Sequence, residues 1–243
     1  MSLTNKTAVV TGASKGLGRA IAKRLAQEGC NLALVARSAE ALSQLADELA
    51  TPLTTGSGIK AQGFACDLSC TESLFKCVDQ IKGTFGSVDI LINNAGTGFY
   101  KPFIDHSPAE HDAIIDVNIK AAIHLTYALL PQMLEKQQGQ IINIASDLST
   151  RPLANMAVYA ASKFALRGFS LSLLKEVKNQ GIKVSLLNPG IIDTCFNNNT
   201  PGNQPAQQAL QPDALAETVL QLLTQPQFQL IDELTVHPQL QDF

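Results

Sequence analysis

The sequence has few charged residues and no excess of either sign. Among 243 residues, 18 are Lys or Arg and 21 are Asp or Glu, which gives a formal net charge of −3. There is no basic run, so the chain lacks a field that would attract nucleic acid or an anionic membrane surface. With 45% apolar and 16% charged residues, the composition is typical of a globular chain and excludes a disordered one.

Long apolar runs and paired cysteines are also missing. The start, MSLTNKTAVVTG, lacks the apolar stretch of a signal peptide, and no apolar run approaches the roughly 18 residues that a membrane span needs. No C-x-x-C pair or second cluster completes a metal site, so we expect no metal and free thiols in a reducing cytoplasm. The three cysteines closest in sequence are interpreted as small buried hydrophobic residues. The five cysteines are Cys30, Cys66, Cys70, Cys77 and Cys195.

Apolar, β-branched segments alternate with amphipathic segments along the whole chain. The predicted strands span residues 7–12, 31–37, 59–66, 88–96, 140–146, 182–190 and 228–236. The predicted helices include residues 17–27, 108 to about 136, 157–178 and about 214–223, and 51–58 is a loop. This alternation predicts an α/β fold with a Rossmann-type, doubly wound parallel sheet of about seven strands and helices on both faces. Residues 1–243 form a single domain, since no break in composition suggests a second one.

Capping signals mark several of the expected helix ends. Gly29 ends the first helix, and Ser38 caps the helix after the second strand. The S-x-x-E spacing that begins at Ser69 predicts a capping box for the third helix. The same spacing begins at Ser107, where Pro108 also occupies the first helical position.

Three glycines lie between the first predicted strand and the first predicted helix, in TGASKGLG. Gly12 lets the chain turn sharply, while Gly16 and Gly18 allow a pyrophosphate to approach the free backbone N–H groups at the helix N-terminus. A glycine cluster at this place in a βαβ chain predicts dinucleotide binding.

The end of the second strand indicates which dinucleotide binds. NAD enzymes place an acid about 20 residues after the glycine turn, but Ala36 stands there and Arg37 follows. Lys15, inside the glycine turn, is placed to reach the same 2′-phosphate. Two cations and no acid favour NADP(H), and the alternative is that Arg37 is an ordinary solvated strand end. Asp67, after the third strand, is placed to accept a hydrogen bond from the adenine amine.

Polar side chains gather where a ligand is expected. Tyr159 and Lys163 are four residues apart and share one helix face. Ser146 ends the fifth strand, at the edge where open α/β sheets bind ligands. Asn118 is an amide in an apolar stretch of the long helix, which a buried hydrogen bond also explains.

Together these residues fit the reduction of a carbonyl, which needs a hydride from one side and a proton at oxygen. The ammonium of Lys163 favours the phenolate of Tyr159, and we expect it to lower the tyrosine pKa from its usual value near 10. Ser146 is placed to hold the carbonyl oxygen and to stabilise developing negative charge. Asn118 is placed to fix a water that passes protons to Lys163.

The motifs TGASKGLG, NNAG, Asn118, Ser146, YAASK and NPG with Thr194 beyond it resemble, in this order, the short-chain dehydrogenase/reductase family from end to end. The resemblance implies that Tyr159 is the general acid/base and that Lys163 tunes it and binds the nicotinamide ribose. Ser146 would orient the substrate and Asn118 would complete the proton relay. The implied cofactor contacts are Gly12, Ser14, Lys15, Gly16, Leu17, Gly18, Arg37, Asp67, Leu68, Asn94, Ala95, Gly96, Tyr159, Lys163, Pro189, Gly190, Ile192 and Thr194.

The segment at about 191–212 corresponds to the family's lid over the substrate. No charged residue lies between Asp193 and Asp213, so the segment offers no obvious partner for a substrate carboxylate or phosphate. Five apolar residues nearby would line an apolar substrate pocket in one interpretation. In the other interpretation they belong to ordinary core or surface packing. These residues are Phe99, Tyr100, Leu148, Leu153 and Phe196.

Several activities fit such a chain. A 3-oxoacyl-acyl-carrier-protein reductase would carry basic residues at the ends of the two long helices, where this chain has EKQQGQ and KNQG. We therefore favour an NADPH-dependent reductase of free aldehydes or ketones. A cofactor sensor or a scaffold has no need of Tyr159 and Lys163 together. The apolar outer faces of the two long helices and the resemblance predict a homo-oligomer, a tetramer or a dimer, with no nucleic-acid or membrane partner.

Overall fold

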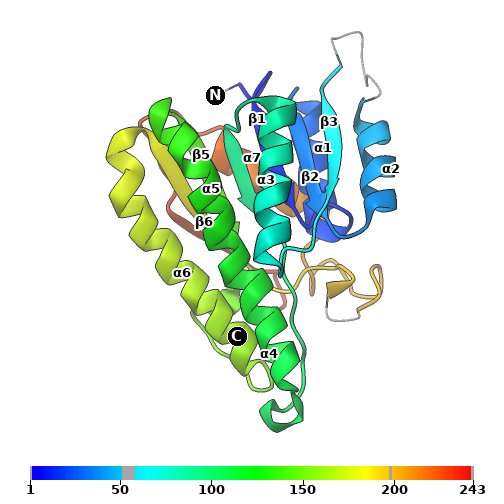
Figure 1. Ribbon diagram of the computed structural model, residues 1–243. Coiled ribbons are helices and arrows are strands. Elements are labelled where there is room, and N and C mark those ends of the chain that lie inside the picture. The colour runs from blue at the N-terminus through cyan, green and yellow to red at the C-terminus, as the bar shows by residue number, and fades with distance from the viewer. Residues whose placement is uncertain (1, 51–57, 197–198, 242–243) are drawn as a thin grey trace.

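The computed structural model describes residues 2–50, 58–196 and 199–241. Its centre is one sheet of seven strands in the order β3-β2-β1-β4-β5-β6-β7, with every neighbouring pair parallel (Figure 1). The strands are β1 (Thr7–Thr11), β2 (Asn31–Ala36), β3 (Ala61–Ala65), β4 (Ile90–Asn93), β5 (Gly139–Ile144), β6 (Ile182–Pro189) and β7 (Glu233–Val236). The strand order reverses between β1 and β4, so the predicted doubly wound parallel sheet is confirmed.

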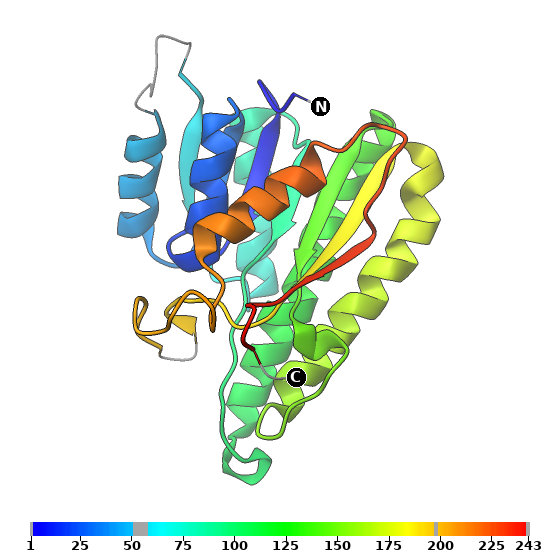
Figure 2. The ribbon, with the colours of Figure 1, turned by 180° about the vertical axis from the view of Figure 1, so that it is seen from behind.

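Helices cover both faces of the sheet. They are α1 (Gly16–Gln27), α2 (Ala39–Ala50), α3 (Thr71–Phe85), α4 (Pro108–Ile115), α5 (Ala121–Glu135), α6 (Ala157–Val177) and α7 (Pro212–Leu223). α3, α5 and α6 pack on the face seen in Figure 1, and α1, α2 and α7 pack on the face seen in Figure 2. Every residue of β1 is buried, because a parallel sheet with two helical layers has no solvated face.

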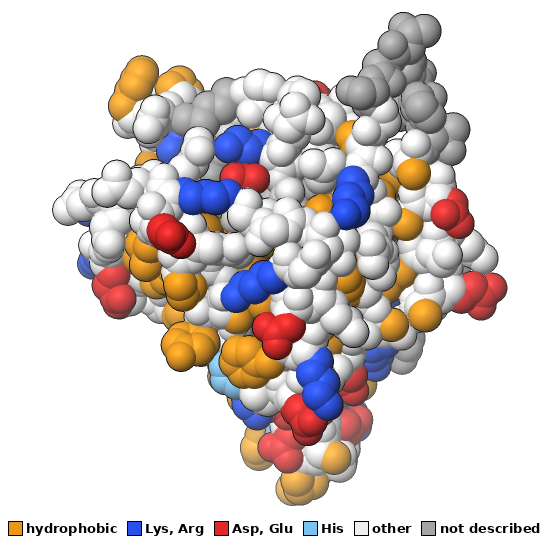
Figure 3. All heavy atoms as spheres, turned by 45° about the horizontal axis from the view of Figure 1, so that its top comes forward, with side chains coloured by type: hydrophobic (Ala, Val, Ile, Leu, Met, Phe, Trp, Pro, Cys, Tyr) orange, Lys and Arg blue, Asp and Glu red, His pale blue; other side chains and the backbone are white. Residues whose placement is uncertain are grey.

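Acidic and basic side chains are interspersed on the face that Figure 3 shows.

Among the five cysteines, Cys66 and Cys77 are buried as expected, but Cys70 is exposed and that expectation was wrong. Cys70 is the N-cap of α3, and its position at the start of the helix faces solvent. Among the described residues, no cluster of three or more His, Cys, Asp or Glu side chains is arranged to hold a metal ion.

Most of the predicted caps are present. The Ser38 hydroxyl accepts a hydrogen bond from the Ala41 N–H at 3.3 Å, Ser107 forms a complete capping box, and Gly29 has a φ of 75°. The capping box predicted at Ser69 is wrong, because α3 has no side-chain cap. The Ser69 hydroxyl donates instead to the carboxylate of Asp67 at 2.7 Å, and this local bond competes with capping.

The last predicted strand is longer than the strand observed. The last strand covers only Glu233–Val236, which pairs with the end of β6. Before it, the Gln229 N–H donates to the Pro226 carbonyl in a turn, and Phe228 is 94% exposed. A turn that satisfies its own backbone groups leaves nothing to pair with the sheet. Most of the predicted loop at 51–58 lies outside the described residues.

The long helix predicted from Pro108 continues through α4 and α5, but it contains one π-helical turn at Asp116–Lys120. Within the described part of the chain, the stretch Pro108–Glu135 is the one helix that by length and composition is apolar enough to cross a membrane. It packs on the sheet through Leu125, Leu129 and Met133, which are buried in the core. It is therefore a core helix.

Candidate active site

The glycine turn is a closely packed backbone cradle, with the Asn94 amide and the Thr194 methyl group beside it. Gly12 and Gly16 have φ values of 67° and 56°, which favour glycine. A Cβ on Gly18 would lie 2.3 Å from the Gly12 carbonyl oxygen, so the close packing there excludes any other residue. α1 begins directly after Lys15, whose side chain makes no capping hydrogen bond. The first N–H groups of α1 thus have no side-chain cap, which is the arrangement that binds phosphate.

The end of β4 is tied to this turn. The Thr11 hydroxyl accepts hydrogen bonds from the Asn94 and Ala95 N–H groups at 2.9 and 3.0 Å. The Asn94 side-chain amide donates to the Thr11 carbonyl at 2.8 Å. The NNAG segment therefore lies beside the glycine turn, at the crevice between β1 and β4 where doubly wound sheets bind nucleotides.

The side chains predicted to select the nucleotide lie at the same edge. Lys15 and Arg37 are both exposed, at the start of α1 and just after β2. Asp67 follows β3, and hydrogen bonds from Ser69 hold its pKa below the usual value, with a smaller contribution from the charge of Arg37. The charge of Arg37 thus acts on Asp67, and Lys15 lies inside the glycine turn.

The catalytic residues predicted from sequence meet at the carboxyl end of β5. Tyr159 and Lys163 lie on α6 and are only 8% and 4% exposed, while Ser146 follows β5 and is 7% exposed. The Tyr159 ring lies 5.6 Å from the Phe196 ring, measured between centroids. A Cβ on Gly98 would come within 2.7 Å of the Tyr159 ring, so the chain after β4 also closes over the tyrosine.

Burial controls the protonation of this pair. It raises the pKa of Tyr159 to about 12, and the charge of Asp147 acts in the same direction, while a hydrogen bond with Ser146 lowers it. The net lowering of the Tyr159 pKa that was expected from Lys163 is therefore wrong, because the effect of burial is larger. The Lys163 ammonium lies 5.5 Å from the tyrosine ring centroid and donates to the Ile144 carbonyl at 3.0 Å. Burial lowers the pKa of Lys163 itself to about 8.

Asn118 lies in the π-helical turn, and its side chain joins three segments. Its Oδ1 accepts from the Thr97 N–H at 2.8 Å, and its Nδ2 donates to the Thr97 carbonyl at 2.9 Å and to the Ser162 hydroxyl at 3.0 Å. The Ser162 hydroxyl donates to the Tyr159 carbonyl at 2.7 Å. The buried hydrogen bonds offered as the alternative are thus present. The proton-relay role of Asn118 stays a prediction, and π turns occur frequently at functional sites.

Asp147 was missed by the sequence analysis. The Ser146 hydroxyl donates to its Oδ1 at 3.0 Å and accepts from the Leu148 N–H at 3.2 Å. The position directly after the predicted serine was visible in the sequence. The contact between Asp147 and Ser146 could not be predicted, because the direction of a side chain after a strand end depends on the surrounding segments.

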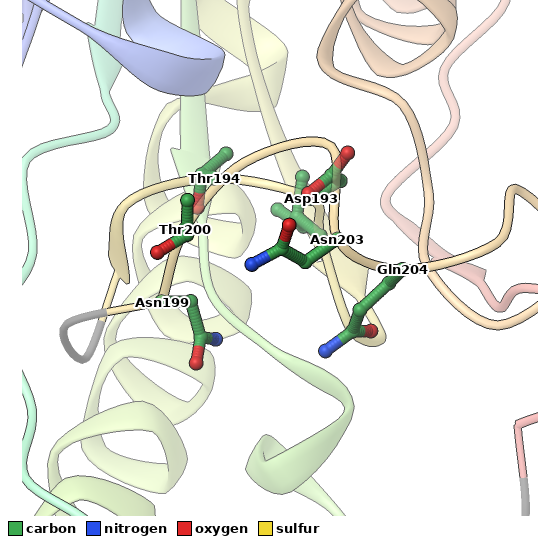
Figure 4. A pocket seen from close by; sticks show the side chains of 7 residues that line it. Asp193, Thr194, Asn199, Thr200, Asn203 and Gln204 are labelled. Atoms are coloured by element: carbon green, nitrogen blue, oxygen red, sulfur yellow. The ribbon is translucent and has the colours of Figure 1, made fainter.

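The segment that was predicted to form the lid begins beside the glycine turn. A Cβ on Gly16 would lie 3.2 Å from the Thr194 methyl group, so the two segments are in contact. The Asp193 carboxylate accepts the Gly202 N–H at 2.9 Å. A cavity of about 110 Å³ lies within the lid (Figure 4). Its lining residues are Ile192, Asp193, Thr194, Asn199, Thr200, Asn203 and Gln204.

The five apolar residues that suggested a substrate pocket have different surroundings. Phe196 packs on Tyr159, whereas Phe99 packs on His106, with 6.2 Å between ring centroids. Tyr100 and Leu153 are more than half exposed, at 54% and 53%. Phe196 therefore has a ring contact with Tyr159, and the apolar pocket stays a prediction.

Comparisons with known proteins agree with this geometry. A family model for short chain dehydrogenases matches residues 6–205. An uncharacterised oxidoreductase of Staphylococcus epidermidis is 35% identical over 233 residues, which are 96% of this chain and 97% of the relative.

Two solved structures match along their whole length. An alcohol dehydrogenase from the archaeon Thermococcus sibiricus, complexed with 5-hydroxy-NADP, has a TM-score of 0.90 at 32% identity, with 98% of each chain covered. A metagenomic short-chain oxidoreductase in complex with NADP has a TM-score of 0.84 at 36% identity, with 99% of this chain and 100% of that chain covered. With the glycine cradle and the Ser146, Tyr159 and Lys163 cluster at one sheet edge, these matches show that the chain belongs to the short chain dehydrogenase family and is an oxidoreductase.

Proposed function

We propose that this protein is an NADPH-dependent reductase that converts an aldehyde or ketone to an alcohol. The observation that carries the proposal is the buried Tyr159 phenol, which shares a hydrogen bond with Ser146 and has its pKa raised to about 12. A phenol with that pKa keeps its proton throughout the neutral range. The raised pKa makes the phenol a weaker acid, but the phenol is protonated and lies beside Ser146, so it can donate a proton to a carbonyl oxygen in the direction of reduction.

The residues present fit NADP(H). The pyrophosphate would lie on the first N–H groups of α1, which no side chain caps. Lys15 and Arg37 are exposed at the same edge and would hold the 2′-phosphate by charge-assisted hydrogen bonds. The two solved relatives described above hold NADP or 5-hydroxy-NADP, which supports the same choice for this chain.

The mechanism follows from the positions of the side chains. When bound, the reduced nicotinamide supplies a hydride to the carbonyl carbon. Ser146 orients the carbonyl by donating a hydrogen bond to its oxygen, and it stabilises the negative charge that develops there. Tyr159 transfers its proton to that oxygen. The Lys163 ammonium, buried one turn further along α6, stabilises the phenolate that remains and holds the nicotinamide ribose.

The substrate is proposed to be a free carbonyl compound. The described lid residues between Asp193 and Asp213 carry no charge, so the lid offers no cation for a carboxylate or a phosphate. The helix ends at Glu135–Gln140 and Lys178–Gly181 are mostly uncharged, which argues against docking of an acidic carrier protein.

The test is NADPH oxidation measured with a panel of aldehydes and ketones. Tyr159→Phe should retain NADPH binding and lower kcat by about 10²- to 10⁴-fold, which is the usual contribution of a positioned acid. Tyr127→Phe is the matched control, because Tyr127 is 71% exposed on the outer face of α5 and should keep full activity. Full carbonyl reduction by Tyr159→Phe would refute the mechanism.

We also propose a cytoplasmic homo-oligomer. Apolar side chains are exposed along the outer faces of the long helices, namely Ile115, Ile123, Tyr127 and Phe164, each at least 37% exposed. A second copy of the chain would cover them. Light scattering at micromolar concentration should give a multiple of 25.9 kDa, and a mass of one chain would contradict the proposal.

A further inference from the structure

The C-terminal segment returns to the candidate active site. After β7 the chain runs along the carboxyl edge of the sheet, and Gln241 contacts the segment that follows β5 (Figure 2). The Gln241 side chain makes two hydrogen bonds there. Its Nε2 donates to Asp147 Oδ2 at 2.6 Å, and its Oε1 accepts from the Ile191 N–H at 2.9 Å.

These contacts join two parts of the site that are far apart in sequence. The other carboxylate oxygen of Asp147 accepts a hydrogen bond from the Ser146 hydroxyl at 3.0 Å. The Asp147 carboxylate is therefore the single group that connects Gln241 to Ser146. In the other direction, Ile191 is the first residue of the lid. The Leu240 N–H also donates to the Gln207 carbonyl at 2.8 Å, near the end of the lid.

Gly190 makes room for the glutamine. A Cβ at this position would lie 2.1 Å from Gln241 Oε1 and 3.0 Å from the His237 ring. Contacts under 3.0 Å do not occur for real Cβ atoms, so any other residue at position 190 would displace the end of the Gln241 side chain from its present contacts. The sequence analysis assigned Gly190 to the cofactor, and the structure shows that it also accommodates the tail.

We propose that Gln241 is a positioning residue that holds the Asp147 carboxylate against Ser146 and attaches that carboxylate to the start of the lid. In the protein without substrate the Ser146 proton points to Asp147, and it must turn to the carbonyl oxygen when substrate binds. Gln241 limits how strongly Asp147 competes for that proton, because it occupies the other carboxylate oxygen. This inference rests on the proposed carbonyl reduction.

A glutamine is the residue that suits both contacts. Its amide nitrogen is a donor for the carboxylate, and its amide oxygen is an acceptor for the backbone N–H. A glutamate at this position would only accept, and it would set a second negative charge against Asp147. The other titratable groups that face this contact are His237, whose Nε2 lies 3.5 Å from Asp147 Oδ2, and Tyr159, which responds to the charge of Asp147.

The first experiment compares Gln241→Ala and Gln241→Glu with Gln239→Ala. Gln239 is an exposed residue of the same tail and is the matched control. The two Gln241 variants should lose about tenfold or more in kcat/KM for the carbonyl, the value of a hydrogen bond to a charged group, while NADPH affinity measured by fluorescence changes by less than about threefold. Gln241→Glu should recover activity as pH falls toward about 5, because two adjacent carboxyl groups then share a proton. Gln241→Ala should show no such recovery.

A double variant tests the contact directly. In Asp147→Asn combined with Gln241→Glu, the asparagine amide donates to the glutamate, while its oxygen still accepts from Ser146. Activity should return to within about threefold of the parent, although each single variant is impaired. The inference is wrong if the Gln241 variants have the same kcat/KM for the carbonyl as Gln239→Ala. It is also wrong if the double variant is no more active than either single variant.

A third measurement separates this inference from the proposed function. Hydrogen exchange of a peptide covering residues 190–193 should be faster in Gln241→Ala than in Gln239→Ala, because the Ile191 N–H loses its acceptor. Unchanged exchange would overturn the contact even in an active enzyme. Faster exchange in a protein that reduces no carbonyl would overturn the proposed function and the inferred effect on Ser146, while the contact would stand.

Discussion

Lys163→Met should make this protein more stable while removing its activity. Lys163 is 4% exposed, and its ammonium donates one hydrogen bond to the Ile144 carbonyl at 3.0 Å. Burial lowers its pKa from 10.5 to about 8, so the folded protein disfavours the charge. Methionine has a similar length and no charge, and it fills irregular core space well.

The magnitude follows from the pKa. At about 1.4 kcal/mol per pH unit, the difference between 10.5 and about 8 corresponds to about 3 kcal/mol of free energy lost by burying the ammonium. The methionine variant also loses the hydrogen bond to Ile144, which contributes about 1 kcal/mol. The net gain in the free energy of unfolding at pH 7 is therefore about 2 kcal/mol, or about 4–8 °C in Tm.

The pH dependence provides the sharper test. Below about pH 8 the lysine is charged in both the folded protein and the unfolded chain, so burying the ammonium has its full destabilising effect on the folded protein. Between about 8 and 10.5 the folded protein gives up the proton first, and the stability of the parent rises with pH. Lys163→Met should lack this rise, so the stability difference between the two proteins should shrink across that window.

Thermal unfolding of both proteins, at one protomer concentration and from pH 6.5 to 10 in steps of about half a unit, measures this difference. Lys175→Met is the matched control, because Lys175 is exposed near the end of the same helix and its removal should change stability by less than about 0.5 kcal/mol. A Lys163→Met variant that is less stable than the parent at pH 7, or that shows the same rise above pH 8, would refute the reasoning. A stable variant without activity would also show that the buried charge is kept for function.

Two further predictions concern the cofactor. Arg37→Asp should move the ratio of kcat/KM for NADPH and NADH toward NADH, since it removes a cation and adds a repulsive acid; a parent enzyme that prefers NADH would contradict the assignment. Gly18→Ala should abolish NADPH binding in a fluorescence titration, because the new Cβ would lie 2.3 Å from the Gly12 carbonyl oxygen. Gly83→Ala, on α3, is its control, since a Cβ there meets no atom within 4 Å, and it should leave NADPH binding unchanged.

Much of the fold could be predicted from the sequence because its signals are local. Buried parallel strands are continuous apolar runs, and the helices between them carry caps such as Ser38 and Ser107. The predictions failed where two local options compete. Ser69 bonds to Asp67 instead of capping α3, and the segment before β7 forms a turn instead of pairing with β6.

The groups that lie together at the proposed active site could be predicted from the sequence. A glycine turn after the first strand, a serine after the fifth, and a tyrosine and lysine one turn apart must meet, because the carboxyl ends of parallel strands share one edge. The protonation of these groups was decided by the tertiary structure. The pKa of Tyr159 is raised because the whole fold buries it, and this effect outweighs the expected influence of the neighbouring lysine.

Only the tertiary structure could reveal the contact between Asp147 and Gln241, which are 94 residues apart in the chain. No periodicity or spacing links the two positions, since their contact depends on where β7 ends and on the space beside Gly190. A side chain's partner across the fold is set by the path of the whole backbone between them. Local sequence patterns therefore predict which residues reach the site, and the packing of distant segments decides how those residues are held there.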